Sequence, residues 1–357
     1  MHPLASRRLA STLTPFAAPA DVVRWFGAVQ SQDFAPAKWS LGERLTGIGD
    51  VEVQRAFDAG EFLRTHVLRP TWHFVAPEDI RWLLRLTGPR VHATNAYYYR
   101  QCGLDDAVLA KAHDLLTAEL AGEAWRTRKE LAALIDGAGL PTAGFALAYT
   151  LMHAELDGLI CNGPTRGKQQ TYALLEERVP PTPERDREWA LAEIVTRYFT
   201  SHGPATAKDL RWWSSLTLTD IASGVELAGD RLRHEVVDGL SYWSGWHDPS
   251  PPASPTVHLV QGYDEYVVGF AESKWLLDAY GRTRAIPAGT VLPNGVLLLD
   301  GQVVGHWKRT STRDTLLVEA LLHRPLTPAE SQALEAAAAR QATFLNLRAQ
   351  VTTRLLT

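Results

Sequence analysis

Two segments of the chain share one pattern of polar and apolar positions, about 80 residues apart. Each opens with a threonine three positions before an acidic residue, Thr127 before Glu130 and Thr206 before Asp209, a spacing typical of a capped helix start. In the first segment, apolar residues then recur at helical spacing: Phe145, Ala148, Met152 and Leu156. Gly158 follows where a glycine commonly ends a helix. Both segments therefore predict two successive helices joined by a turn.

A short strand pair is predicted after each pair of helices. Residues 159–161 and 240–243 are apolar runs of strand length. In the first segment the loop between the two strands, residues 162–170, carries Arg166 and Lys168 near its tip. Helix, turn, helix and a strand pair with a basic loop is the order of a winged helix-turn-helix.

A looser third copy of this pattern occupies the N-terminal part of the chain. Residues 51–59 have helical periodicity, and residues 62–68 form an apolar strand. Arg69 and Pro70 make a turn, and residues 71–75 return, which predicts a β-hairpin. We therefore predict three winged helix-turn-helix modules in tandem.

The C-terminal part of the chain has a different pattern, rich in strands. Four apolar runs predict strands, at residues 257–260, 266–270, 296–299 and 302–307. Asn294-Gly295 and Asp300-Gly301 are hairpin turn signals. A helix over residues 328–340 closes the pattern.

These patterns together predict an α+β fold, mainly helical, in which three tandem winged helix-turn-helix modules precede a small β-rich, barrel-like domain. Proline-rich stretches at residues 179–183 and 249–255 mark two of the boundaries. The four predicted domains span residues 1–100, 101–180, 181–250 and 251–357.

Composition narrows the classes of protein to which this chain belongs. A length of 357 residues suits several modules, and its 2 cysteines exclude a disulfide framework and offer no metal-ligand spacing. We find no signal peptide and no apolar run long enough to cross a bilayer, so we expect a cytoplasmic protein without membrane contact. The net charge of −4 argues against an indiscriminate nucleic-acid binder. The first hundred residues nevertheless carry a basic excess that suits a local DNA-facing surface.

The best candidates for chemistry are two neutral amides, Gln30 and Gln32, because the chain offers no obvious charged catalytic pair. They follow a mostly apolar helix that Asp21 is expected to cap. An extended turn after a firmly packed helix projects both amides to one side.

Four stretches of the chain, in this order, carry a resemblance to a known family: Gly27-Ala28-Val29-Gln30-Ser31-Gln32, His66-Val67-Leu68-Arg69-Pro70-Thr71-Trp72-His73, Tyr263-Asp264-Glu265-Tyr266-Val267-Val268-Gly269 and Gly305-His306-Trp307-Lys308. They resemble the AlkZ-like DNA glycosylases, bacterial winged-helix proteins that excise bulky or crosslinked N7-alkylpurines. The resemblance implies that Gln30 and Gln32 carry catalysis. The polar Ser31 departs from the small or apolar residue expected between them.

The chemistry of an N7-alkylated purine agrees with neutral catalytic groups. Its positive charge makes the base a good leaving group, so a strong general acid is unnecessary, unlike in ordinary glycoside hydrolysis. A glutamine carbonyl can accept from the attacking water while its NH2 donates to sugar or phosphate oxygens. Either Gln30 or Gln32 could orient the water, and Asp33 is a possible electrostatic helper. The expected partner is double-stranded DNA carrying alkylated bases, bound by a monomer at the nucleoid.

The first hairpin and the basic wing supply six candidate DNA contacts: His66, Arg69, Thr71, His73, Arg166 and Lys168. His306, Lys308 and Arg309 are further candidates for a DNA-facing surface. In the alternative interpretation the two histidines face a packed sheet, Arg69 supports the turn and the wing residues serve solubility. A metal site at the two histidines lacks a third ligand at recognisable spacing, so we expect no metal and no cofactor.

Two other functions fit the same modules. A non-catalytic winged-helix regulator predicts a recognition helix rich in Arg, Asn or Gln, whereas residues 145–157 contain none of these. An inactive scaffold that uses winged helices for protein contacts is the third possibility, and replacing the two glutamines distinguishes it from an enzyme.

Overall fold

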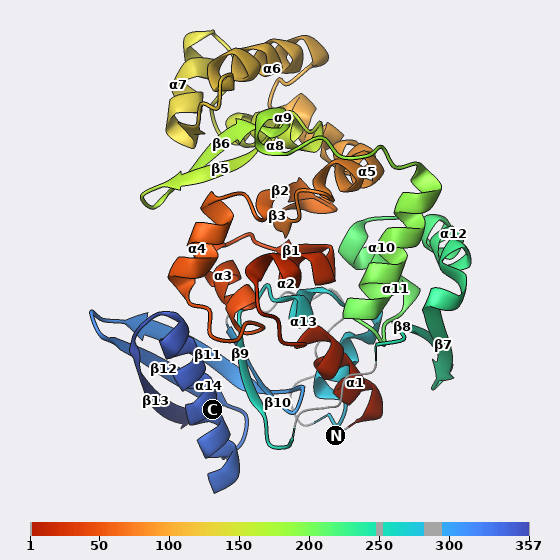
Figure 1. Ribbon diagram of the computed structural model, residues 1–357, viewed down its shortest axis with the longest axis vertical. Helices are drawn as coiled ribbons and strands as arrows, with labels where there is room; N and C mark the ends of the chain where they lie inside the picture. The colour runs from red at the N-terminus through yellow and green to blue at the C-terminus, as the bar shows by residue number, and fades with distance from the viewer. Residues whose placement is uncertain (1, 248–252, 282–294, 357) are drawn as a thin grey trace. The chain divides into compact units, whose positions relative to one another are not determined.

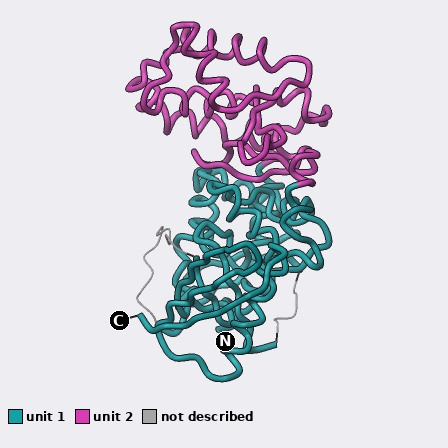
Figure 2. The backbone as a smooth tube through the Cα atoms, turned by 90° about the vertical axis from the view of Figure 1, so that its left-hand side faces the viewer, with its two compact units in different colours: residues 1–54, 191–357 teal, residues 55–190 magenta. Residues whose placement is uncertain are grey.

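The computed structural model describes residues 2–247, 253–281 and 295–356. The chain forms two compact units: unit 1 comprises residues 1–54 and 191–357, and unit 2 comprises residues 55–190 (Figure 2). Both contain helices and strands, so the predicted α+β class is confirmed. None of the helices in the described ranges is long and apolar enough to cross a membrane.

The helices of unit 1 come from both ends of the chain (Figure 1). Two of them, α4 and α10, cross the boundaries between the units. The elements before the strand-rich part are α1 (Pro3–Thr12), α2 (Pro19–Phe26), β1 (Ala28–Gln30), α3 (Phe34–Gly42), α4 (Asp50–Asp58), α10 (Arg187–Ser201), α11 (Ala207–Ser214), α12 (Leu218–Ala228), β7 (Leu232–Val237) and β8 (Leu240–Gly245). Thr206 and Asp209 form the predicted capping box at the start of α11.

Unit 1 ends in a sheet of five strands in the order β13-β12-β11-β10-β9. Its elements are β9 (Val257–Val260), α13 (Glu265–Val268), β10 (Gly295–Leu299), β11 (Gln302–Ser311), β12 (Thr315–Leu322), α14 (Pro328–Phe344) and β13 (Arg348–Leu355). Neighbouring strands are antiparallel except for β12 and β13, which are parallel. Helix α14 packs against β9 and β13, as its position over the sheet in Figure 1 shows.

Three features of this sheet differ from the sequence prediction. Its described strands form an open sheet, with β9 and β13 at the two edges, and no closed barrel. Residues 266–270, predicted as a strand, lie instead on and just after the short helix α13, because the Asp264 side chain accepts from the Tyr266 N–H at 3.0 Å and caps a helical turn there. Strands β12 and β13 were not predicted at all. The Asp300-Gly301 turn is confirmed between β10 and β11, whereas Asn294 and much of the second proline-rich stretch lie outside the described residues.

Unit 2 contains a hairpin, a helical layer and a second small sheet. Its elements are β2 (Leu63–Val67), β3 (Arg69–Val75), α5 (Ile80–Gln101), α6 (Asp106–Leu120), β4 (Arg126–Thr127), α7 (Arg128–Gly137), α8 (Ala146–Leu156), β5 (Ile160–Arg166), β6 (Gln169–Leu174) and α9 (Leu175–Arg178). Strands β2 and β3 pair as the predicted antiparallel hairpin, but its turn lies at Leu68, with a φ of 66°, and the predicted turn residues Arg69 and Pro70 begin β3. Strands β4, β6 and β5 form a sheet in that order. Leu116, Leu131, Ile135, Leu151 and Tyr172 belong to the core of this unit.

The predicted start of α7 and the predicted end of α8 are confirmed, but the apolar positions singled out along α8 by their spacing are only in part the buried ones. Thr127 and Glu130 form a reciprocal capping box, and Gly158 follows α8 with a φ of 71°. Leu156 is buried, but Phe145, the residue before α8, is 74 % exposed, and Leu151, which is not among those positions, is buried. The core of unit 2 contacts a face of the helix that coincides with them only in part, a choice that periodicity in an evenly apolar helix cannot make.

Candidate active site

The candidate catalytic residues lie in a short stretch, residues 28–33, that we call the glutamine segment. It begins where α2 ends, and α2 is fixed in unit 1 by a buried face that includes Val22, Val23 and Phe26. Gly27 follows with a φ of 78°, a value that glycine adopts without strain. The chain then runs extended through β1, whose three residues are all buried.

A buried carboxylate holds this segment in place. The Gln30 N–H donates to Oε1 of Glu265 at 2.6 Å. The second carboxylate oxygen, Oε2, accepts from the indole N–H of Trp213 at 2.9 Å and lies 3.2 Å from Nε2 of His202. Because Glu265 is fully buried, these donors replace the water that a carboxylate otherwise binds. Burial lowers the pKa of His202, and Glu265 acts in the opposite direction.

Asp264, the residue before Glu265, anchors α13 through an ion pair with Arg44. Asp264 accepts two bonds from Arg44, from Nη1 to Oδ2 at 2.8 Å and from Nη2 to Oδ1 at 2.7 Å, and both side chains are buried. Burial acts to lower the pKa of Arg44, but the carboxylates of Asp264, Glu43 and Glu265 together outweigh it, so this pKa is raised. Arg44 also donates to main-chain carbonyls of α1 and α3. The bidentate pair therefore ties α13 to two helices of unit 1.

The residues of the glutamine segment differ in how far their side chains are exposed to solvent. Gln30 is 5 % exposed and Ser31 is 0 % exposed, whereas Gln32 is half-buried and Asp33 is exposed. Only a small side chain suits a fully buried position between two larger amides, which accounts for serine at position 31. Gln32 therefore presents the more accessible of the two amides.

A cavity of about 370 Å³ in unit 1 adjoins the end of this segment. Asp33, Tyr263, Trp307, Lys308 and Arg309 are among the residues that line it. The Lys308 side chain is exposed, and Arg309 is half-buried. Two cations beside aromatic rings suit a phosphate with a neighbouring base or sugar.

The two hairpin histidines are buried in unit 2. Nδ1 of His66 makes a short hydrogen bond with the buried carboxylate of Glu155, which also accepts from the indole N–H of Trp72 at 3.3 Å. The His66 and Trp72 rings lie 4.4 Å apart, centre to centre. His73 is fully buried, with Nδ1 2.9 Å from the carbonyl oxygen of Thr71. Burial agrees with the alternative in which these histidines pack in the sheet, and their contact with DNA stays a prediction.

The other residues of unit 2 that were predicted to contact DNA are more exposed than the two histidines. Arg69 and Thr71 are half-buried on β3. Arg166 and Lys168 are exposed at the tip of the β5–β6 hairpin. Arg166 donates to Glu130 at 2.8 Å and to a main-chain carbonyl at 2.8 Å, so its guanidinium already has local partners. The structure thus places Gln30 and Gln32 together in unit 1 and all six predicted DNA contacts in unit 2.

Comparison with known proteins identifies the family. The model of the family described as DNA glycosylase AlkZ-like matches residues 23–344, which is most of the chain. The chain belongs to the DNA glycosylase AlkZ-like family. The resemblance carried by the sequence motifs is therefore confirmed.

A protein sequence and a solved structure, both from Streptomyces sahachiroi, are similar to this AlkZ-like chain. The "Interstrand DNA cross-link repair glycosylase" is 23% identical over 316 residues, covering 81% of each protein. The solved structure of "Streptomyces sahachiroi DNA glycosylase AlkZ" matches with a TM-score of 0.77 at 21% identity, covering 98% of each chain. At this identity the structural match shows that the two proteins share a fold.

Sequence reasoning missed the residues that support the glutamine segment in this AlkZ-like protein. Asp264 and Glu265 stand directly before residues 266–270, which the sequence predicted as a strand, and neither was singled out as a site residue. The Asp264 side chain capping Tyr266 was the local signal available. Nothing local indicated that Glu265 binds Gln30, because the two residues are 235 positions apart.

Proposed function

We propose that this protein is a DNA repair glycosylase that hydrolyses the N-glycosidic bond of an N7-alkylated purine in double-stranded DNA. Bulky adducts and interstrand crosslinks are the proposed substrate class. Membership of the AlkZ-like family and the similarity to an interstrand DNA cross-link repair glycosylase support this proposal. The observation that carries it is the glutamine segment, which presents two amides and whose main chain is bound at Gln30 by the buried Glu265.

The proposed reaction needs little from the protein beyond position and fixed dipoles. As the bond between C1′ and N9 breaks, its electron pair neutralises the cationic base, and positive charge develops on the sugar. A water oxygen bonds to C1′ and releases its proton to solvent. Amide dipoles that are already oriented stabilise this charge without reorganising. Because the attacking atom is a water oxygen, the proposed enzyme is monofunctional and leaves an abasic site.

We assign the water-orienting role to Gln32, the more accessible amide, through its carbonyl oxygen. The largely buried Gln30 then acts through its NH2 group on sugar or phosphate oxygens. Asp33, exposed at the edge of the 370 Å³ cavity, adds negative charge near the developing cation. Lys308 and Arg309, across the same cavity, are placed to bind phosphate.

DNA binding by this protein is proposed to use the three winged helix-turn-helix modules over residues 1–100, 101–180 and 181–250. The exposed Arg166 and Lys168 form the basic tip of one strand pair, as a wing requires. We propose that the protein acts as a monomer at the nucleoid, with the half-buried Arg69 and Thr71 contacting the backbone near the lesion.

A base-release assay tests the proposal. Duplexes carrying N7-methylguanine, a bulky N7 adduct or an N7 crosslink are incubated with the protein and then heated in alkali, which cleaves abasic sites. We expect strand cleavage with the wild type and with Gln332→Ala, a control that replaces an exposed glutamine on α14. Removing one oriented dipole typically costs about 100–1000-fold in rate, so we expect losses of that order for Gln30→Ala and Gln32→Ala.

The outcomes separate the proposed enzyme from the other two functions. Damage-independent, sequence-specific binding without base release indicates a regulator. Base release that is unchanged in both glutamine variants contradicts the assignment of catalysis to this segment. Lys308→Ala tests the cavity separately, because loss of one phosphate contact weakens binding on all sequences and lowers the salt slope by about one.

A further inference from the structure

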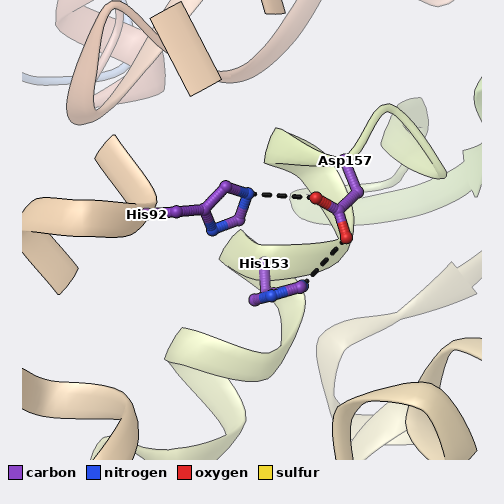
Figure 3. Close-up of side chains that lie close together, drawn as sticks. All are labelled: His92, His153 and Asp157. Atoms are coloured by element: carbon purple, nitrogen blue, oxygen red, sulfur yellow. Dashed lines mark hydrogen bonds and ion pairs between the residues drawn. The ribbon is translucent and has the colours of Figure 1, made fainter. Parts of the chain in front are cut away.

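Four side chains from three helices of unit 2 converge at one point, and none of them belongs to the candidate active site or to the predicted DNA contacts. His92 lies on α5, His113 on α6, and His153 and Asp157 at the end of α8. Residues four apart share one face of a helix, so His153 and Asp157 point the same way. Figure 3 shows His92 and His153 both directed at the two oxygens of Asp157.

The spacing of the donor atoms suits a single metal ion. Nε2 of His92 lies 3.0 Å from Oδ1 of Asp157, and Nδ1 of His153 lies 3.2 Å from Oδ2. One donor atom from each of these three residues lies within 4.8 Å of the other two. Nε2 of His113 is 3.2 Å from Nδ1 of His153. Two ligands of a tetrahedral Zn²⁺ ion, each about 2.0–2.2 Å from the metal, lie roughly 3.3–3.5 Å apart, close to these separations.

The ring of His92 is held by a second partner, as a metal ligand requires. Its other nitrogen, Nδ1, lies 3.0 Å from the hydroxyl oxygen of Tyr99, which also lies 3.5 Å from the Asn95 amide nitrogen. With the proton of His92 on Nδ1 and donated to Tyr99, Nε2 keeps its lone pair directed at the cluster. Ligating histidines almost always donate their other ring N–H in this way.

Hydrogen bonding inside the protein accounts for this cluster less well than a metal does. Three imidazoles share one carboxylate, and the ring nitrogens of His113 and His153 face each other. A cation between them accepts every one of these lone pairs at once. Three nitrogens and one carboxylate oxygen are the ligands that Zn²⁺ prefers, whereas Mg²⁺ and Ca²⁺ prefer oxygen alone. All three histidines are partly exposed, so the ion can enter from solvent.

We propose that His92, His153 and Asp157 hold a Zn²⁺ ion, with the neighbouring His113, 3.2 Å from His153, as its fourth ligand, in a site that ties α5, α6 and α8 together. Four protein ligands complete a tetrahedral ion, so the site stabilises unit 2 and leaves no open position for catalysis. Sequence patterns do not indicate this site, because its ligands come from three helices with no recognisable motif spacing. The site is independent of the proposed glycosylase activity.

Direct metal binding tests this proposal. Tag-free, chelator-treated protein is titrated with Zn²⁺ by calorimetry, and Co²⁺ absorbance reports the coordination geometry. We expect one Zn²⁺ per chain, a tetrahedral Co²⁺ spectrum, and a higher Tm with metal, because an ion that binds only the folded state stabilises it. His153→Ala and Asp157→Asn should weaken binding beyond the roughly 10–100-fold typical of losing an outer partner.

Two further variants keep the test interpretable. His234→Ala removes an exposed histidine of β7 and should bind Zn²⁺ as the wild type does. Tyr99→Phe removes only the outer partner of His92, so roughly 10–100-fold weaker binding is expected even if the ligand variants do not fold. Absence of stoichiometric binding to the wild type overturns the proposal. Equal affinity in His153→Ala, Tyr99→Phe and His234→Ala overturns it as well.

Discussion

Glu265 is the residue whose replacement tests the architecture of the candidate site most directly. Its carboxylate accepts from the main chain of Gln30 at 2.6 Å and from Trp213 at 2.9 Å, with His202 at 3.2 Å, and no part of it reaches solvent. Glu265→Gln keeps the shape of the side chain but replaces one acceptor oxygen by an NH2 donor. Either the Gln30 N–H or the Trp213 N–H must then face a donor.

The expected cost follows from these contacts. A buried donor without a partner costs about 1–3 kcal/mol, and the other bond loses about 1 kcal/mol when its acceptor is no longer charged. His202 adapts by moving its proton to Nδ1, which faces the Ser201 hydroxyl at 2.9 Å. Removing the charge also removes the desolvation penalty of a buried carboxylate, which offsets part of the loss. We expect a net loss of about 2 kcal/mol, which lowers Tm by about 4–8 °C for a unit of this size.

Thermal unfolding and single-turnover base release measure the two consequences. Displacing a catalytic segment by about 1 Å can cost 100-fold in rate, so we expect base release by Glu265→Gln to fall by about 10–100-fold while DNA affinity changes little. Glu319→Gln on β12, where the side chain is exposed, is the control and should keep both values. If Glu265→Gln matches this control in both Tm and rate, Glu265 does not hold the glutamine segment.

Three further predictions test the fold by urea or thermal unfolding. Gly27→Ala should destabilise the protein by about 1–2 kcal/mol, because the φ of Gly27 is 78°. Gly137→Ala in α7, where a methyl group meets open space, should stabilise the protein by up to about 1 kcal/mol, and a change of the same sign in both variants contradicts the conformational argument. Leu151→Ala should lower the free energy of unfolding by about 2–5 kcal/mol and Phe145→Ala by less than about 0.5 kcal/mol, because Leu151 is 1% exposed and Phe145 is 74% exposed. A larger loss in Phe145→Ala than in Leu151→Ala refutes the buried face assigned to α8. Hydrogen bonds from Arg324 first and then from the start of α14 lower the pKa of Glu330 to about 2, so the stability that its carboxylate contributes is present above pH 4.5 and is lost between pH 4.5 and 2. The free energy of unfolding of Glu330→Gln should therefore be lower than that of the wild type at neutral pH and equal to it near pH 2. A difference that persists near pH 2 contradicts this linkage.

The elements that the sequence predicted correctly depend on contacts between near neighbours. The capping boxes of α7 and α11 each join residues three positions apart, and the Asp300-Gly301 turn joins adjacent strands. Such contacts form whatever the rest of the chain does, so their residue types are visible in the sequence. The same locality explains why the β2–β3 hairpin was predicted with nearly correct bounds.

The elements that were predicted wrongly or missed depend on distant partners. Strand β13 becomes a strand because it pairs with β12 across the intervening α14. The buried face of α8 depends on which elements of unit 2 pack against it, since the helix is apolar on several sides. Propensity and periodicity describe a segment and not its neighbours, so tertiary packing decides these cases.

The residues of the candidate sites fall into the same two groups, those that the sequence indicates and those that only the fold brings together. The sequence alone singled out Gln30 and Gln32, because the helix before them, the spacing between them and the family resemblance are all visible along the chain. Only the tertiary structure placed Glu265 against Gln30 and brought together the three histidines around Asp157. Those partners are separated by tens to hundreds of residues, and burial of a charge or convergence of ligands is a property of the folded chain as a whole.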